Sequence, residues 1–247
     1  GSDNRLATRS FKSGEKFVFS YDKEGRCVAA EGPEGKFSYY FDYQPGVTVV
    51  TDSLGVQKRY YHRDGIVTKE VDSREGETIY HYDSCQNLLS KEGPDGKAKI
   101  YTYDDRGNLV CAQIPGNGTT KIDYNHLDLP IAVKLPGGAE WRYEYDEQGN
   151  LIRQVNPNNR QSNYLWTEGL LKKIQDSVSG DTELFYDRNK SLNEILYPNE
   201  TSEYWVRDMH GKVLSYCNVK GAKTFYTYDT ADRLIEAHLP DGNIRSY

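Results

Sequence analysis

Residues Tyr101–Thr119 read YTYDDRGNLVCAQIPGNGT, and residues Tyr143–Asn159 read YEYDEQGNLIRQVNPNN. The two stretches share an aromatic pair, an acidic residue, a Gly-Asn-Leu run and a later proline, and matching residues lie 42 positions apart. At half that spacing, weaker copies centre on Tyr82 and Tyr124. An internal repeat determines the architecture before any local signal does, so the register of this repeat decides the fold.

The repeat is 20 or 21 residues long and fills the chain from about Phe17 to its end. We take the residue before the acidic position as the anchor of each copy. The anchors, all but one of them aromatic, are Tyr21, Phe41, Tyr61, Tyr82, Tyr103, Tyr124, Tyr145, Trp166, Tyr186, Arg207 and Tyr228. The aspartates that directly follow an anchor are Asp22, Asp42, Asp83, Asp104, Asp146, Asp187, Asp208 and Asp229. Glycines four residues after an anchor are Gly25, Gly65, Gly107, Gly149 and Gly211.

Each position of the repeat has a physical reason. Aromatic residues two apart, such as Tyr143 and Tyr145, lie on one face of a strand, because strand side chains alternate. The aspartate accepts hydrogen bonds from backbone amides two residues on and starts a turn. The glycine supplies the positive φ that closes a short hairpin loop. Seven of the nine prolines lie twelve residues after an anchor, where a second turn is expected because proline cannot donate to a sheet.

The repeat therefore predicts an all-β fold: an antiparallel strip of about eleven repeats and 22 short strands, joined as consecutive hairpins and curling into an open spiral or partial shell. No long stretch has apolar residues at helical spacing. With 28% charged residues and a mean hydropathy of −0.81, the composition is polar, as expected for a thin, one-layer sheet.

Charge and composition narrow the range of partners. The net charge is −6, with no basic stripe, which argues against nucleic acid. No apolar run is long enough to span a membrane. The four cysteines fall at different positions of the repeat without a Cys-x-x-Cys pair, which favours free thiols over disulfides or a metal site.

The phrase Tyr-Asp-x-x-Gly-Asn-Leu followed by a proline turn resembles the RHS or YD repeat, and Tyr103–Leu109 and Tyr145–Leu151 match it best. The resemblance implies a β-sheet strip that spirals into a hollow shell. In bacterial polymorphic toxins and insecticidal toxin complexes such a shell encloses a C-terminal toxin domain, and teneurins carry a similar shell on the cell surface. The Asp-Pro dipeptide of the autoproteolytic core motif in the bacterial shells is absent from this sequence.

The first hypothesis is therefore structural: a non-catalytic wall segment whose partners are the rest of an RHS shell and its C-terminal toxin domain, in a secreted or cell-surface bacterial parent. Gly1-Ser2 is typical of an expression scar, and residues 3–247 are expected to be one continuous segment of a longer array. Exposed edge strands of such a segment predict edge-to-edge self-association. The segment itself carries no targeting signal.

The second hypothesis is adhesion, in which rows of aromatic rings bind glycans or a partner's sheet edge. Its best candidates are Trp141, Trp166 and Trp205, which are large and can donate a hydrogen bond. Cross-strand aromatic ladders also stabilise a sheet by themselves. The recurring aspartates are interpreted as turn residues, and the five histidines have no ligand spacing, so no catalytic residue, cofactor or metal ligand is predicted. The residues expected to define the repeat structurally are Tyr21, Asp22, Gly25, Tyr82, Asp83, Tyr103, Asp104, Gly107, Tyr145, Asp146, Gly149, Tyr186, Asp187, Tyr228 and Asp229.

Overall fold

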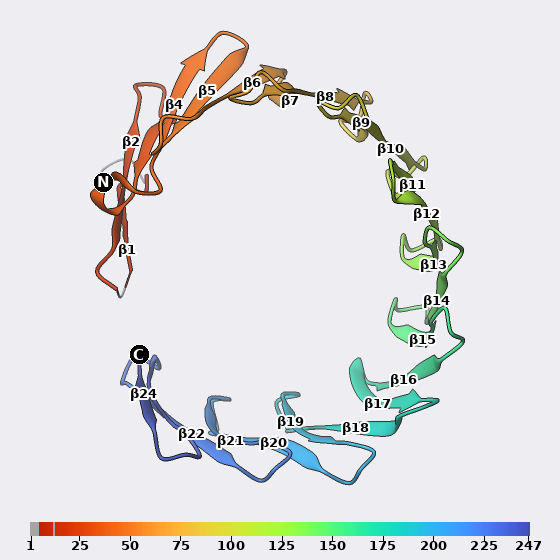
Figure 1. The fold of residues 1–247 in the computed structure, drawn as a ribbon. Helices are drawn as coiled ribbons and strands as arrows, with labels where there is room; N and C mark the ends of the chain where they lie inside the picture. The colour runs from red at the N-terminus through yellow and green to blue at the C-terminus, as the bar shows by residue number, and fades with distance from the viewer. Residues whose placement is uncertain (1–4, 12) are drawn as a thin grey trace. The chain divides into compact units, whose positions relative to one another are not determined.

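The computed structural model describes residues 5–11 and 13–247, and it confirms the all-β prediction (Figure 1). It contains 24 strands, each antiparallel to the strands it pairs with, and one short 3-10 turn, Pro33–Gly35. By its contacts the chain forms two compact units that divide after Lys121. The proposed expression scar, Gly1-Ser2, lies outside the described residues.

The first unit is a run of hairpins in chain order. Its strands are β1 (Thr8–Ser10), β2 (Lys16–Tyr21), β3 (Cys27–Glu31), β4 (Tyr39–Gln44), β5 (Val47–Asp52), β6 (Gln57–Arg63), β7 (Ile66–Val71), β8 (Glu77–Tyr82), β9 (Leu88–Glu92), β10 (Ala98–Tyr103) and β11 (Leu109–Ile114). Strand β12 (Gly118–Tyr124) leads into the second unit.

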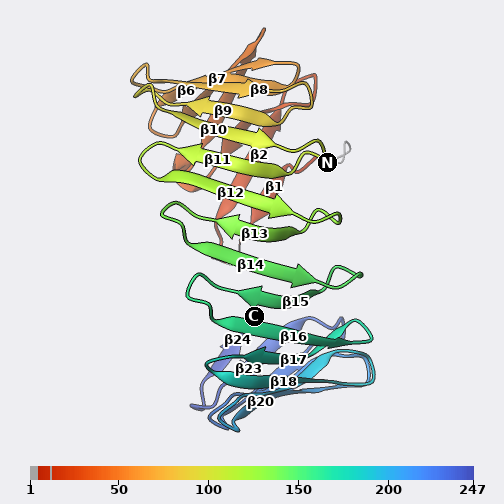
Figure 2. The ribbon, with the colours of Figure 1, turned by 90° about the vertical axis from the view of Figure 1, so that its right-hand side faces the viewer.

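The second unit repeats the same pattern, and Figure 2 shows its strands side by side in chain order. They are β13 (Pro130–Lys134), β14 (Glu140–Tyr145), β15 (Leu151–Val155), β16 (Gln161–Thr167), β17 (Leu170–Asp176), β18 (Gly180–Tyr186), β19 (Leu192–Leu196), β20 (Ser202–Arg207), β21 (Val213–Cys217), β22 (Lys223–Tyr228), β23 (Leu234–His238) and β24 (Ile244–Ser246). Taken by itself, each unit follows an arc in Figure 1.

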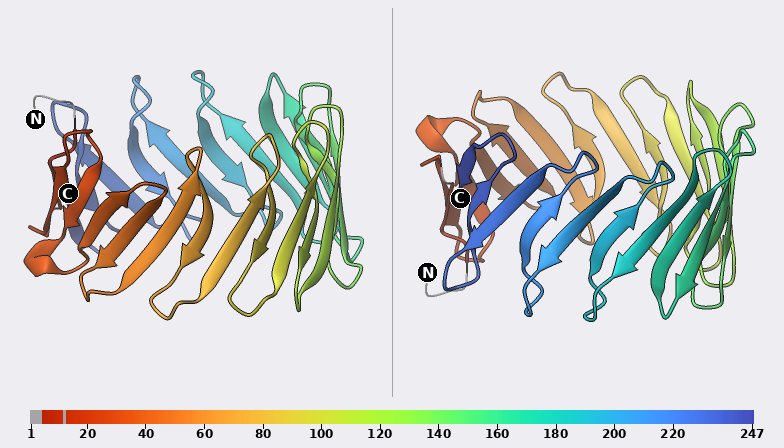
Figure 3. Two further views of the ribbon diagram at one scale, coloured as in Figure 1. Left: turned by 90° about the horizontal axis from the view of Figure 1, so that it is seen from above. Right: turned by 90° about the horizontal axis from the view of Figure 1, so that it is seen from below.

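Over residues 5–11 and 13–247, each unit is a single layer of strands, and no other strand or helix of the same unit covers either face (Figure 3). The buried hydrophobic residues in the described part of the chain are accordingly few: Val71, Cys217 and Ala237. The anchor residues are half-buried instead. This explains how so polar a composition supports an ordered fold, because its strands are stabilised by their neighbours rather than by a central core.

The first turn of the repeat is a five-residue loop built on its aspartate. In the loop after β14, the Asp146 N–H donates to Asn150 O (3.0 Å) and the Gly149 N–H donates to Asp146 O (3.1 Å). The Asp146 carboxylate accepts from the backbone N–H of Gln148 (3.0 Å), as predicted, and also from that of Asn150 (2.8 Å). Gly149 has φ +83°, so the expected positive φ is confirmed.

The second turn often uses the same loop. Asn156 accepts through Oδ1 from the N–H of Asn158 and of Arg160, at 2.9 Å each, and the turn proline, Pro157, directly follows Asn156. Glycine is not obligatory at the left-handed position. Non-glycine residues with positive φ at this place in the first turn are Gln86, Asp128, Lys190 and Asp232.

A β-bulge recurs in the hairpins that follow the anchors. In β14–β15 the register shifts between Glu144 and Tyr145, so that Ile152 is the extra residue. The corresponding extra residues in the other hairpins are Val28, Thr68, Leu89, Val110, Lys172, Asn193, Leu214 and Ile235. Bulges bend a strand and increase its twist, so their recurrence curves each unit. The β4–β5 hairpin pairs without a register shift.

One repeat departs from the predicted register. Phe41 and Asp42 lie inside β4, and the turn falls at Pro45-Gly46, with Gln44 paired to Val47. The interpretation of Asp42 as a turn residue was therefore wrong, because the strand continues past it to a shorter proline-glycine turn. Tyr43 takes the place of Phe41 as the anchor of this repeat, because the Tyr43 hydroxyl donates a hydrogen bond to Cys27 O in the preceding repeat.

Candidate functional site

In eight repeats the anchor side chain reaches back to the repeat before it. Tyr145 on β14 donates from its hydroxyl to Pro130 O, at the start of β13 (3.0 Å). Tyr103 makes the same bond to Leu88 O (3.0 Å). Equivalent bonds join Tyr21 to Leu6 (3.0 Å), Tyr43 to Cys27 (2.8 Å), Trp166 to Leu151 (2.8 Å), Tyr186 to Leu171 (2.8 Å), Arg207 to Leu192 (2.9 Å) and Tyr228 to Val213 (2.9 Å).

We call this bond the anchor clasp. It requires a long side chain with a terminal donor, which explains why Trp166 and Arg207 replace tyrosine at two anchors. It also explains the shift from Phe41 to Tyr43, since phenylalanine has no donor. The anchors therefore hold consecutive hairpins together.

Partial burial shifts the pKa of two tyrosine anchors. Burial raises the pKa of Tyr103 and of Tyr145. The pKa of the turn aspartates Asp146 and Asp104 is lowered instead. The Asn150 side chain and nearby backbone N–H groups stabilise the Asp146 carboxylate and lower its pKa, and Asn108 does the same for Asp104.

The carboxylates of the repeat are thus committed to turns. Another carboxylate, Asp176, accepts from Arg160 (2.9 Å) and from the Ser162 hydroxyl (2.8 Å), and its pKa is strongly lowered, chiefly by the arginine. Over residues 5–11 and 13–247, no three His, Cys, Asp or Glu side chains gather as a metal site would require. All four cysteines are free thiols; Cys217 is buried and Cys85 exposed. In the same residues, no helix is long and apolar enough to cross a membrane.

The three tryptophans have different surroundings. Trp166 is used in the anchor clasp. Trp141 lies nearly parallel to Tyr143 on the same strand, with ring centroids 6.5 Å apart. Trp205 stacks on Tyr216 of the next strand, with ring centroids 5.4 Å apart. Trp205 also lines a hollow in the surface.

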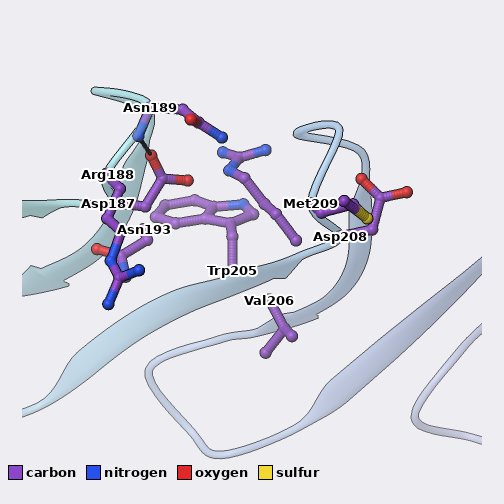
Figure 4. Close-up of a pocket in the computed structure, with 9 residues that line it drawn as sticks. Asp187, Arg188, Asn189, Asn193, Trp205, Val206, Asp208 and Met209 are labelled. Carbon is purple, nitrogen blue, oxygen red and sulfur yellow. Dashed lines mark hydrogen bonds between the residues drawn. The ribbon is translucent and has the colours of Figure 1, made fainter.

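The hollow beside Trp205 has a volume of about 440 Å³ (Figure 4). The turn after β18 supplies Asp187 and Asn189, β19 supplies Asn193, and the turn after β20 supplies Met209. In Figure 4 the Asp187 and Asn193 side chains lie beside one end of the indole, while Val206 points away from it on the opposite face of β20.

A larger hollow, of about 590 Å³, lies in the first unit between the β6–β7 turn and β8. Its lining includes Tyr80, whose hydroxyl donates to Glu70 (3.3 Å), and Asp83, which holds its own turn. No lining side-chain atom there is both buried and without a hydrogen-bond partner, judged over the described parts of the chain. The Trp205 hollow is therefore the stronger candidate for binding.

The geometry defines a class of protein: a one-layer repeat strip in which anchor clasps join successive hairpins. The chain belongs to the teneurin YD-shell family, whose model matches residues 56–192, and it is a shell-type YD-repeat segment. The predicted resemblance is thereby confirmed.

Relatives and solved structures agree with this assignment. The chain is 29% identical over 225 residues to a probable deoxyribonuclease, RhsB, of Dickeya dadantii (strain 3937), covering 90% of this chain and 16% of that protein. It is 30% identical over 95 residues to a tRNA3(Ser)-specific nuclease, WapA, of Bacillus spizizenii, covering 37% of this chain and 4% of the relative. The chain thus spans a small part of the relatives it matches.

The fold matches that of a toxin-complex structure, TcdB2-TccC3 without its hypervariable C-terminal region, with a TM-score of 0.70 at 15% identity. The match covers 96% of this chain and 15% of the other. A Photorhabdus luminescens Tc holotoxin pore matches with a TM-score of 0.69 at 16% identity, covering 95% of this chain and 15% of that one. These likenesses concern the fold alone.

Proposed function

We propose that this chain is a non-catalytic wall segment of a shell that encloses or presents a C-terminal toxin domain in a bacterial Rhs-type protein. The observation that carries the proposal is the anchor clasp. In eight repeats it joins a hairpin to the one before, so that the strip extends by adding repeats without a core. Repeats joined in this way can form an extended wall that is one strand layer thick.

The relatives support the same role. Two of them are named as nucleases, and this chain covers only 16% and 4% of their lengths. We infer that nuclease activity resides elsewhere in those proteins, because the carboxylates described here are engaged in turns and ion pairs. The partners of this segment are then the rest of the shell and its C-terminal domain, and the parent protein is secreted or displayed on the cell surface.

We also propose that residues 3–247 are one continuous stretch of repeats. Within its own unit, β1 pairs with β2 and β24 pairs with β23, so each has one side on which another strand can add. We expect further repeats to occupy these sides in the parent protein, and a second copy to compete for them in the isolated segment.

Limited proteolysis of the parent protein tests containment. We expect its C-terminal domain to survive about tenfold longer inside the parent than when purified alone, because a protease reaches it only after the wall opens. Gly149→Val, which strains a turn of the wall, should shorten that survival. Equal cleavage of the enclosed and the isolated domain would show that the segment is not a container.

A further inference from the structure

The turns of this strip are rich in asparagine, and the structure divides these asparagines into two groups. In the larger group, hydrogen bonds within the turn hold the side chain. Its members are Asn87, Asn108, Asn125, Asn150, Asn156, Asn199, Asn218 and Asn243. In the smaller group, the side chain has no hydrogen-bond partner within residues 5–11 and 13–247. Its members are Asn117, Asn158, Asn159 and Asn189.

Asn117 differs from the other asparagines of the smaller group in the residue that follows it. It precedes Gly118, and no other asparagine in the chain precedes a glycine. Both residues are exposed where β11 turns into β12, and Gly118 has φ +93°. The Asn117 N–H donates to Ile114 O (3.0 Å), so the turn holds the main chain of Asn117 and leaves its carboxamide unrestrained.

We propose that Asn117 is a site of spontaneous deamidation. The backbone nitrogen of Gly118 attacks Cγ of Asn117 and gives up its proton, so that a new C–N bond closes a succinimide ring. The side-chain nitrogen of Asn117 takes up a proton and leaves as ammonia. One water molecule then opens the ring at either of its two carbonyl carbons, and the product is aspartate or isoaspartate.

Two features of this turn favour the ring closure. Glycine has no Cβ, so nothing at position 118 crowds the attacking nitrogen. A carboxamide without hydrogen bonds can turn toward that nitrogen without first losing a partner. Asn150 has neither feature, because its Nδ2 donates to Asp146 Oδ2 (2.9 Å) and it precedes leucine. Asn189 has a free side chain but precedes lysine, so these asparagines form a graded series within one chain.

The two products should affect the hairpin differently. Aspartate adds a negative charge and leaves the main chain unchanged, whereas isoaspartate routes the main chain through the side chain and lengthens the turn. The pairs Ile114–Gly118 and Gln113–Thr119 lie directly against this turn. Amide exchange at this end of the hairpin should accelerate on the order of tenfold in the isoaspartyl chain. It should stay nearly unchanged in the Asn117→Asp variant, which has the charge without the longer main chain.

Ageing the purified chain in mildly alkaline buffer, with mass spectrometry of its proteolytic peptides, tests the site. Peptides that carry Asn117 should convert at least about tenfold faster than those that carry Asn150 or Asn189. Labelling by protein isoaspartyl methyltransferase measures the isoaspartyl share. A synthetic peptide of residues 113–121 gives the rate without the fold, and the folded chain should react within about tenfold of that rate.

Gly118→Ala, made both in the chain and in the peptide, is the matched variant. It should slow conversion by about tenfold or more, and the result in the peptide does not depend on whether the variant chain folds. The proposal is overturned if Asn117 does not lead Asn189 by the expected margin, or if folding slows it by more than about tenfold. An unchanged rate in the Gly118→Ala peptide would also overturn it. Failure here leaves the proposed wall function intact, since that function does not depend on this turn.

Discussion

At the scale of single residues, the anchor clasp explains the tyrosines better than ring stacking does. Tyr145→Phe removes only the hydroxyl that donates to Pro130 O, and it should cost about 0.5–1.5 kcal/mol of unfolding free energy. Tyr143→Phe is the control on the same strand, because the Tyr143 hydroxyl makes no hydrogen bond within the described residues. Urea denaturation of both variants measures the difference, and equal stabilities would show that the clasp contributes nothing.

The left-handed turn residue gives a second prediction. Gly149→Val forces a β-branched residue to φ near +83°, with its Cβ 3.4 Å from Leu129 Cδ1. We expect a loss of about 1–2 kcal/mol. Gly149→Asn should lose much less, because asparagine tolerates this conformation and Asp128 and Lys190 adopt it in equivalent turns. If the two variants are equally stable in denaturant titrations, backbone strain is not the cause.

The turn aspartates predict a dependence of stability on pH. The pKa of Asp146 is lowered in the folded state, so its stabilisation is complete above the unfolded-state pKa of about 3.9 and is lost as the pH falls through the lower, folded value. The urea midpoint should hold between about pH 5 and 7 and drop below about pH 4. Asp146→Asn should flatten part of that drop, because Asn125 Oδ1 accepts the same backbone N–H bonds without titrating. An unchanged drop would exclude Asp146 as a contributor.

At the scale of the hairpin, the sequence predicted the strands and turns within a hairpin better than the contacts that join one hairpin to the next. Strands, both turns and the positive φ of Gly149 followed from aromatic alternation, aspartate, glycine and proline. The bulge did not, because an extra residue in a strand leaves the spacing of the repeat unchanged. The anchor clasp could not be predicted either, because its acceptor is a backbone carbonyl, which every residue has.

The same reasoning explains what was missed at the candidate site. Trp205 was predicted from its size and its hydrogen-bond donor, together with Trp141 and Trp166, and the sequence could not distinguish the three. Asn193 and Met209 were not singled out, because they belong to neighbouring repeats and only the folded sheet brings them to the same hollow.

The bulge itself can be tested by deletion. Removing Ile152 takes the extra residue out of β15, so Leu151 and Arg153 can no longer both keep their partners on β14. Amide exchange in β14 and β15 should accelerate on the order of tenfold or more. Ile152→Val keeps the bulge and should exchange nearly as the unchanged chain does. Equal protection in the deletion variant would mean that the bulge is dispensable.

At the scale of the whole chain, the unpaired edges of the terminal strands are expected to determine whether the isolated segment self-associates in solution. An exposed strand edge pairs with other chains, so we expect the isolated segment to self-associate with rising concentration. Sedimentation velocity measures this directly. Replacing Ser246 on β24 with proline removes a backbone N–H that points away from β23 and should reduce association, whereas Ser246→Ala should not. A strict monomer at all concentrations would exclude edge pairing.

The central claim is that this chain is the wall of a container. The most direct measurement is a cryo-electron microscopy map of the full-length parent protein. We predict that these repeats appear as part of a continuous one-layer sheet, with density for the C-terminal domain on its enclosed side. A map in which the C-terminal domain lies outside an open strip of repeats would contradict the account.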